Sequence, residues 1–307
     1  MDKRRIGSLT VSAVGLGCNN FGLKLDADAS ARVVHAAIDA GITLFDTADV
    51  YGQTRSEEFL GRALTGKRDS VVVATKFGMP LDEQRKGARP EYVRHAVEAS
   101  LKRLGTDCID LYQLHRPDPT VPIAETLAAL DELVKAGKVR EIGSSNFNAE
   151  QIEAAERDRP AGAARFVSVQ NEYSLLHRDP EREVLAACAK HGIGLMPYFP
   201  LASGMLTGKY VPGEAPPKGS RLSFSQLPLA ARFLTERNLE LAVSLRKFAE
   251  ARGHTLLELA FSWLLARPHV NSVIAGATTV EQVAANSASA SWKLTAAELG
   301  EIDQLLR

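Results

Sequence analysis

Short runs of β-branched and aliphatic residues recur along the chain, each bounded by glycine, proline or polar residues. Their nearly continuous hydrophobicity is typical of strands buried on both faces of a parallel sheet. The runs are Val14–Gly17, Ile42–Ala48, Val71–Phe77, Ile109–His115, Val139–Ser145, Val167–Tyr173, Gly194–Phe199 and Ser272–Gly276. They predict eight parallel strands.

Segments with helical spacing separate these runs. Ala29–Ala40 carries an apolar stripe along one face, and Gly41 follows it as a helix C-cap. Pro90–Leu104 begins with proline in its first turn and ends before Gly105. From the second run to the seventh, the starts are roughly thirty residues apart, which is the length of a repeated strand–helix unit.

The seventh and eighth runs are separated by a longer stretch, which we interpret as a loop insertion at about 200–236 and one extra helix. Two helical segments follow the insertion, Asn238–Arg252 and Thr255–Arg267. Before the first run, Arg4–Ile6 and Thr10–Ser12 flank a glycine and a serine, as in a hairpin. We therefore predict an α/β fold: a (β/α)8 TIM barrel with an N-terminal hairpin, forming a single domain over residues 1–307.

A doubly wound dinucleotide-binding fold is the main alternative. Gly15-Leu16-Gly17 follows the first strand, and Asp46 ends the second. The third glycine of that fingerprint should stand where this chain has Asn20, and Gly22 comes too late. The fingerprint therefore fits poorly, and the barrel is favoured.

Composition narrows the class of protein. The 307 residues include 37 basic and 37 acidic side chains, so the net charge of zero gives no reason to expect nucleic acid or an anionic membrane as a partner. Three cysteines, Cys18, Cys108 and Cys188, lie too far apart for a zinc or redox motif. The N-terminal residues lack the apolar stretch of a secretory signal, and no apolar run is long enough to span a bilayer. We expect a soluble cytoplasmic protein.

Barrel enzymes carry their chemistry at the carboxyl ends of the strands. Asp46, Lys76 and His115 end or closely follow the second, third and fourth runs, and Tyr51 follows shortly after Asp46. Each residue alone has a structural interpretation, such as a turn carboxylate, a packing tyrosine or a hydrogen-bonded histidine. Lys76 is harder to explain this way, because a lysine after five apolar or small residues must be paired or exposed.

Together these four residues predict a proton donor for a carbonyl oxygen. A tyrosine hydroxyl has a pKa of about 10 and is a weak acid unless a nearby cation favours the phenolate. Lys76 supplies such a cation, Asp46 holds it charged, and His115 is placed to hydrogen-bond the substrate oxygen. We expect Lys76 to lower the pKa of Tyr51. No metal-ligand set is apparent in the sequence.

A second group of polar residues ends the later strands. Ser145, Asn146 and Gln170 can pair with a carboxamide, and Tyr198 can stack on a planar ring. The other interpretation of Ser145 and Asn146 is that they cap the helix that begins near Ala149.

The loop after the seventh strand is rich in small residues that let backbone N–H groups approach an anion. It includes Ser203 and Gly204, and Lys209 and Arg221 add positive charge. After the eighth strand, Gly276–Thr279 opens a helix at a place where barrel enzymes frequently bind phosphate. An anionic ligand with an aromatic ring and an amide indicates a nicotinamide dinucleotide.

At this point the chain resembles the aldo-keto reductase family nearly end to end. Three segments are similar to the active-site motifs of the family, and three to its cofactor motifs. They are Leu44–Gly52, Ala74–Phe77, Gln113–Asp118, Gly143–Phe147, Ser168–Tyr173 and Ile274–Asn286.

The resemblance implies a (β/α)8 barrel that uses NADPH without a metal. Tyr51 would be the general acid/base, supported by Asp46 and Lys76, and His115 would orient the carbonyl. The residues implied in cofactor binding are Ser145, Asn146, Gln170, Tyr198, Leu201, Ser203, Gly204, Lys209, Arg221, Gly276, Thr278, Gln282 and Asn286.

The chain departs from the family pattern near the adenosine end. Gly276-Ala277-Thr278 stands where the family often has a basic residue, and Ala285 stands where an acidic residue frequently precedes the asparagine. Lys209 and Arg221 are therefore the main candidates for binding a 2′-phosphate. NADPH is favoured, and NADH is the alternative.

The resulting hypothesis is an NADP(H)-dependent oxidoreductase that interconverts an aldehyde or ketone and an alcohol. One alternative is a regulatory subunit that binds NADP(H), as do the channel β-subunits of the family. Another is a sugar or polyol dehydrogenase that works in the oxidative direction.

Candidate substrate-binding residues follow the early strands. Arg116 offers a cation for a carboxylate or phosphate on the substrate, or pairs with Asp118 instead. The polar Asn19 and Asn20 favour hydroxylated compounds. The remaining candidates are Phe21, Phe77 and the segment 221–224.

Overall fold

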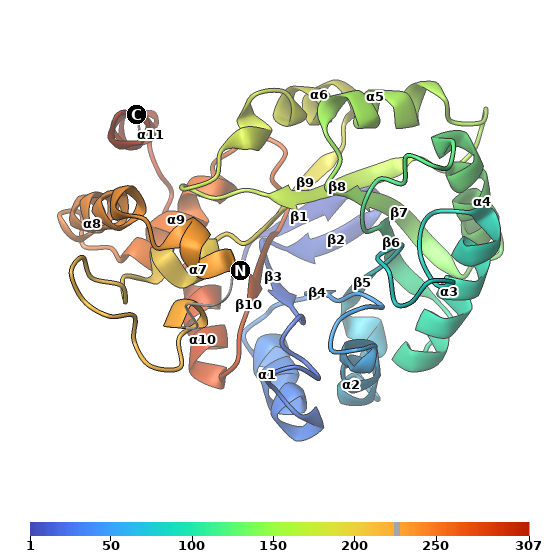
Figure 1. Ribbon diagram of the computed structural model, residues 1–307, viewed down its shortest axis with the longest axis horizontal. Helices are drawn as coiled ribbons and strands as arrows, with labels where there is room; N and C mark the ends of the chain where they lie inside the picture. The colour runs from blue at the N-terminus through green and yellow to red at the C-terminus, as the bar shows by residue number, and fades with distance from the viewer. Residues whose placement is uncertain (224–227, 307) are drawn as a thin grey trace.

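An eight-stranded parallel sheet forms the centre of the protein, and the computed structural model describes residues 1–223 and 228–306. The strand order is β10-β3-β4-β5-β6-β7-β8-β9 (Figure 1). Backbone hydrogen bonds from Leu195 to His269 and from Asn271 to Leu195 link β9 to the chain just before β10, so the sheet nearly closes into a barrel. The strands are β3 (Val14–Gly17), β4 (Leu44–Asp46), β5 (Val72–Phe77), β6 (Ile109–Leu114), β7 (Val139–Ser145), β8 (Phe166–Glu172), β9 (Gly194–Tyr198) and β10 (Val273–Gly276).

Helices alternate with these strands and cover the outside of the barrel (Figure 1). In α3, Pro90 occupies the first turn, and Gly105 ends the helix at a φ of +63°. The apolar face of α3, which includes Val93 and Val97, is buried against the sheet. The predicted (β/α)8 barrel is therefore confirmed. The helices are α1 (Ala27–Asp39), α2 (Arg55–Ala63), α3 (Pro90–Leu104), α4 (Ile123–Lys135), α5 (Ala149–Arg157), α6 (Val184–His191), α9 (Leu256–Leu265) and α10 (Val280–Ala288).

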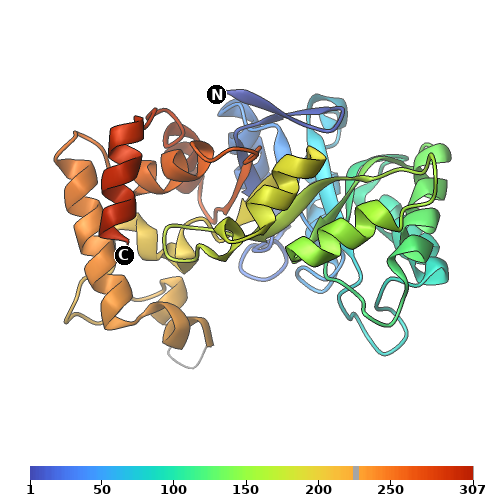
Figure 2. The same ribbon diagram turned by 90° about the horizontal axis from the view of Figure 1, so that it is seen from above.

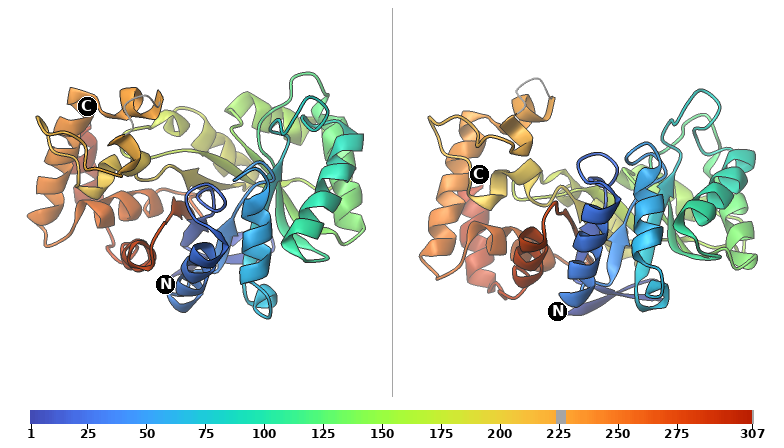
Figure 3. Two further views of the ribbon diagram at one scale, coloured as in Figure 1. Left: turned by 60° about the horizontal axis from the view of Figure 1, so that its bottom comes forward. Right: turned by 90° about the horizontal axis from the view of Figure 1, so that it is seen from below.

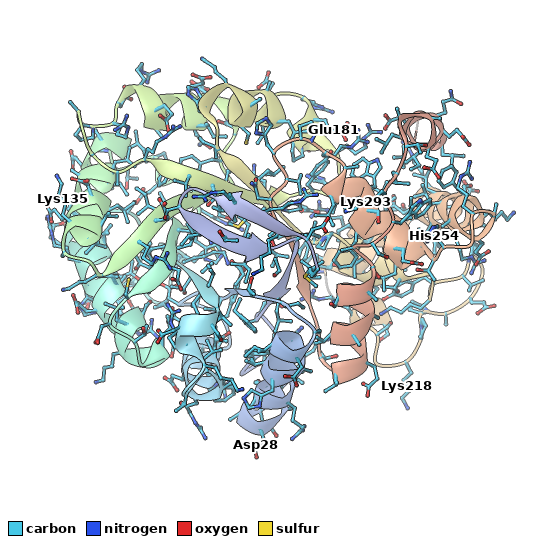
Figure 4. All side chains as sticks on the ribbon, turned by 180° about the vertical axis from the view of Figure 1, so that it is seen from behind. Asp28, Lys135, Glu181, Lys218, His254 and Lys293 are labelled. Atoms are coloured by element: carbon cyan, nitrogen blue, oxygen red, sulfur yellow. The ribbon has the colours of Figure 1, made fainter. Side chains whose placement is uncertain are left out.

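The predicted N-terminal hairpin is also present, as β1 (Lys3–Ile6) and β2 (Leu9–Ser12). Seen from behind, it crosses the middle of the barrel, while labelled charged side chains such as Lys135 and Lys218 lie at the periphery (Figure 4). The buried face of the hairpin packs with residues from several barrel strands into a separate inner core. The hairpin thus closes the amino-terminal end of the barrel.

The connection between β9 and β10 contains more regular structure than the predicted loop and single extra helix. The predicted extra helix is α8 (Glu236–Glu250), but α7 (Pro228–Phe233) lies within the expected loop. Its six residues are too few to give a helical period, although it buries Ala230 and Phe233. Two short 3-10 helices, η3 (Ala202–Thr207) and η4 (Arg221–Ser223), precede it. Residue 224, expected near the substrate, lies outside the described residues.

A last helix, α11 (Ala296–Leu305), was not anticipated from the sequence. It lies beside α8 at one end of the molecule (Figure 2), far from α3 and α4 (Figure 3). Within residues 1–223 and 228–306, every helix is too short or too polar to span a bilayer.

Candidate active site

A cavity of about 730 Å³ opens at the carboxyl ends of the barrel strands. Strands β3, β4, β7, β9 and β10 each contribute their last residue to its wall, and β8 contributes Gln170 near its end. The loops after β5 and β6 contribute others. Every residue expected to bind the cofactor lines this cavity. The other predicted residues in the wall are Asn19, Asn20, Asp46, Tyr51, His115 and Arg116.

Lys76 lies behind the cavity wall, where its side chain is fully buried. Its Nζ donates to Asp46 Oδ2 at 2.7 Å and to the backbone oxygen of Thr47 at 2.8 Å. Burial by itself lowers the pKa of Lys76, but Asp46 and Tyr51 outweigh burial, so the net pKa is raised. The ammonium group therefore stays charged although it is fully buried.

Tyr51 reaches the wall from the loop after β4, and a close backbone contact fixes that loop. A Cβ on Gly52, at a φ of +57°, would lie only 2.3 Å from the backbone oxygen of Phe21. Lys76 Nζ lies 5.1 Å from the Tyr51 ring centre, close enough for its charge to oppose the effect of burial on the pKa of Tyr51. The loop therefore brings the phenol to the buried cation.

The pKa of Tyr51 is raised, which corrects the sequence-based expectation of a lowered value. Burial is the largest cause, and it exceeds the opposing effect of Lys76. Low polarity penalises the phenolate more than a single ammonium group that is already paired with Asp46 can compensate. Tyr51 therefore keeps its proton at neutral pH and is available as a donor.

His115 stands beside Tyr51, with the two ring centres 5.7 Å apart and the rings nearly perpendicular. Burial, followed by the charges of Lys76 and Arg116, lowers the pKa of His115 to about 2. Its Nδ1 is buried and has no hydrogen-bond partner among the described residues. The imidazole is therefore neutral, able to hydrogen-bond a substrate oxygen without adding a charge.

Hydrogen bonds join this corner to the amides of the later strands. Gln170 Nε2 donates to Asp46 Oδ1 at 2.8 Å, and the Ser145 hydroxyl donates to the Gln170 backbone oxygen at 2.8 Å. Asn146 Nδ2 donates to the His115 backbone oxygen at 2.9 Å, and Asn146 Oδ1 accepts from the Tyr198 hydroxyl at 2.8 Å. The two groups of residues found in the sequence thus form one network around the barrel mouth.

The capping interpretation of Ser145 and Asn146 does not hold. The residue that caps α5 is Asn148, in a capping box with Gln151. Asn146 instead adopts a left-handed backbone with a φ of +62°, as do Phe199 and Ser203, which also line the cavity. Such conformations cost roughly 1–3 kcal/mol each and cluster at functional sites.

Three cations gather at the other end of the cavity: Lys24, Lys209 and Arg221. Burial lowers the pKa of each. Repulsion adds to this for two of them, because Arg221 acts on Lys24 and Lys24 acts on Lys209. Among the described residues, no acidic side chain forms an ion pair with any of them. Lys24 was not predicted from the sequence, although it follows the end of a barrel strand as several other site residues do.

The residues present fit a nicotinamide dinucleotide. Ser203 Oγ and Ser220 Oγ are buried at the cavity wall without a partner among the described residues, beside the three cations. Unpartnered hydroxyls and cations suit phosphate oxygens, while the amides and Tyr198 at the opposite end suit a carboxamide-bearing ring.

Two predicted substrate residues do not line the cavity, which is a correction. Phe21 and Phe77 are both fully buried. Phe77 stacks on Tyr112 with the ring centres 4.8 Å apart, so it belongs to the core. Met79 lines the wall instead. The other lining residues that sequence reasoning missed are Gly17, Phe199, Pro200, Thr207, Gly219, Ser220 and Leu257. Ile274, Ala275 and Ala285, which belong to the segment similar to a cofactor motif, also line the wall.

The chain has recognisable relatives. The family model described as "Aldo/keto reductase family" matches residues 13–307. A solved structure of a glycerol dehydrogenase from Gluconobacter oxydans is 34% identical in sequence, with a TM-score of 0.85. The match covers 99% of this chain and 95% of that one.

Proposed function

Because the chain belongs to the aldo/keto reductase family, we propose that it is an NADP(H)-dependent oxidoreductase that interconverts an aldehyde or ketone and an alcohol. The observation that carries this proposal is the reacting corner, meaning Asp46, Tyr51, Lys76 and His115. There a protonated phenol, a buried ammonium group and a neutral imidazole share one end of a large cavity. The same cavity holds the amides and cations that suit a nicotinamide cofactor.

Tyr51 acts as the general acid/base. In reduction its hydroxyl gives a proton to the carbonyl oxygen while the neutral His115 holds that oxygen by a hydrogen bond. Lys76 stabilises the phenolate that remains, and Asp46 keeps Lys76 charged and in place. Preorganised charges of this kind contribute much of the rate in buried sites. When bound, the reduced nicotinamide supplies the hydride.

Cofactor binding divides along the cavity. Ser145, Asn146 and Gln170 would hold the carboxamide, with Tyr198 against the ring. The loop residues Leu201, Ser203 and Gly204, with Lys24, Lys209 and Arg221, would hold the phosphates. Gly276, Thr278, Gln282 and Asn286 would line the adenosine end. We favour NADPH because three cations without a counter-ion suit an additional phosphate, and NADH is the alternative.

A second candidate is a polyol dehydrogenase that works in the oxidative direction. It is supported by the similarity to a glycerol dehydrogenase and by Asn19 and Asn20, whose amides suit hydroxyl groups. The site residues and their roles are the same in both directions. A regulatory subunit that binds NADP(H) is less favoured because all four residues of the reacting corner are present.

The test is to titrate NADPH and NADH by fluorescence and then to measure oxidation of the preferred cofactor with a panel of aldehydes. Tyr51→Phe should lower kcat by about 10²–10⁴-fold, the usual contribution of a general acid. The affinity for the cofactor should stay within about threefold of the parental value, because removing the Tyr51 hydroxyl leaves the amides and cations that are proposed to bind the cofactor unchanged. Tyr92→Phe, on α3 outside the cavity wall, is the matched control.

Two outcomes would contradict the proposal. If Tyr51→Phe reduces a good substrate at the parental rate, the assigned acid is wrong. If the parent binds the cofactor tightly and turns over none of the aldehydes or polyols, the enzyme proposal is wrong and the regulatory subunit is favoured. The cytoplasmic location and the absence of nucleic-acid or membrane partners stay predictions from the sequence.

A further inference from the structure

The cavity wall is strongly cationic. Its basic residues are Lys24, Arg116, Lys209 and Arg221. Asp46 is the only acid among the described residues that line it, and Asp46 is already paired with Lys76. The wall therefore attracts anions over its whole length.

Arg116 is separate from the other three cations. Lys24, Lys209 and Arg221 influence one another, which places them together at the phosphate end. Arg116 instead influences His115 and Tyr198 at the reacting end. Since the cofactor's phosphates already have three cations, Arg116 is left for a different anion.

No described residue forms an ion pair with Arg116. The nearest candidate along the chain, Asp118, is engaged elsewhere: it accepts from the Ala88 backbone at 2.9 Å and from the Thr120 hydroxyl at 2.6 Å. These contacts tie the loop after β6 to the loop before α3. The alternative that Arg116 pairs with Asp118 is therefore not what the structure has, and the guanidinium lies exposed at the rim.

We propose that Arg116 binds a carboxylate or phosphate group on the carbonyl substrate. The inference rests on the proposed function, since it assumes that the carbonyl lies at Tyr51 and His115. A guanidinium offers paired N–H donors that match the oxygens of either anion. Because Arg116 and His115 line the same cavity and the charge of Arg116 acts on His115, the anion must lie close to the reacting carbon. The substrate class is therefore short-chain aldehydes or ketones that carry one anionic group.

The experiment compares kcat/KM for matched substrates at low ionic strength. Glyceraldehyde 3-phosphate is compared with glyceraldehyde, and 4-oxobutanoate with butanal, so that the two arms distinguish phosphate from carboxylate. The parent should prefer the anion in at least one pair by about tenfold or more, and Arg116→Gln should remove most of that preference. Arg116→Lys should restore part of it, since the charge returns without the paired donors. Arg62→Gln, an exposed arginine on α2, is the control.

Each result decides the inference. A parent that reduces neutral aldehydes but prefers neither anion overturns it while leaving the proposed function intact. An Arg116→Gln variant that keeps the full preference shows that another cation binds the anion. A parent that reduces no aldehyde at all refutes the proposed function, and this inference with it. Raising the salt should weaken a genuine preference, because Arg116 is exposed.

Discussion

The two ends of the cavity carry positive charge in opposite ways. At the reacting corner, Lys76 is fully buried, paired with Asp46 at 2.7 Å and held on strand ends. At the other end, where we propose that the phosphates bind, Lys24 and Lys209 lie on loops and Arg221 begins η4. These three cations are unpaired among the described residues, and repulsion lowers the pKa of Lys24 and Lys209. One arrangement is complete without a ligand, and the other lacks its counter-ion.

This difference indicates what each end does. A charge fixed in advance can stabilise a developing phenolate without moving, which is what catalysis requires. Cations that repel each other are relieved when an anion binds, so their unfavourable interaction favours ligand binding. The left-handed backbone of Phe199 and Ser203, next to these cations, also indicates a binding site, because strained conformations cluster at functional sites.

Breaking the buried pair should give the largest effect. Asp46→Asn leaves the Lys76 ammonium buried without a counter-ion, so the free energy of unfolding should fall by about 3–5 kcal/mol. The double variant Asp46→Asn/Lys76→Met removes both charges and should regain part of that stability, while kcat stays about 10²–10⁴-fold below the parent. Chemical denaturation and steady-state kinetics measure the two quantities. If Asp46→Asn is as stable as the parent, the Asp46–Lys76 pair does not stabilise the fold.

A second acidic layer lies behind the reacting corner. Asp49 is 1% exposed, and neither of its carboxyl oxygens has a side-chain partner among the described residues. Glu57, also buried, accepts from Thr75 at 2.6 Å and from Arg103 at 2.7 Å. Burial, and then repulsion from Glu57, raises the pKa of Asp49 to about 7.

This layer predicts a pH dependence of stability. Between the ordinary carboxyl pKa and about 7, the folded protein holds a proton on Asp49 that the unfolded chain has lost, so stability falls as pH rises through that range. Asp49→Asn should remove roughly 2–3 kcal/mol of this fall between pH 5 and pH 8. Urea denaturation at several pH values measures it, with the exposed Glu58→Gln as control. If the free energy of unfolding of Asp49→Asn falls with pH as steeply as that of the parent, the raised pKa of Asp49 is wrong.

The sequence predicted the barrel well, because parallel strands are apolar on both faces and glycines end several of the helices. Each of the eight strands lies within two residues of its predicted ends. The short α7 and the terminal α11 were missed. Their packing depends on distant segments, such as α8 beside α11, and local spacing carries no information about that.

The site was predicted unevenly for a similar physical reason. Polar residues at strand ends stand out against apolar runs, so Asp46, Lys76 and Gln170 could be found. The direction of the shift in the pKa of Tyr51 could not be predicted, because it depends on whether burial or the nearby cation has the larger effect. Phe77 was wrongly predicted to bind substrate. Alternation along the strand, and not the type of side chain, decides whether a residue faces the cavity or the helices.

The phosphate end can be tested one cation at a time. Lys24→Gln, Lys209→Gln and Arg221→Gln should each raise the Kd for NADPH by about tenfold at low salt, and by less at high salt, because these side chains are partly exposed. Fluorescence titration measures this, with the exposed Lys67→Gln as control. If the Kd for NADH rises equally, the cations hold the pyrophosphate and do not select the 2′-phosphate. Three unchanged affinities would remove the anion site altogether.

The smallest expected effect separates a site amide from an ordinary cap two residues away. Asn148→Ala removes the α5 capping box and should lower the free energy of unfolding by about 1 kcal/mol, with cofactor affinity unaltered. Asn146→Ala breaks the hydrogen bonds to His115 and Tyr198, so it should weaken cofactor binding as well. Thermal denaturation and cofactor titration of the two variants give the comparison. If Asn148→Ala weakens cofactor binding as much as Asn146→Ala does, the network at the barrel mouth does not end where the structure places it.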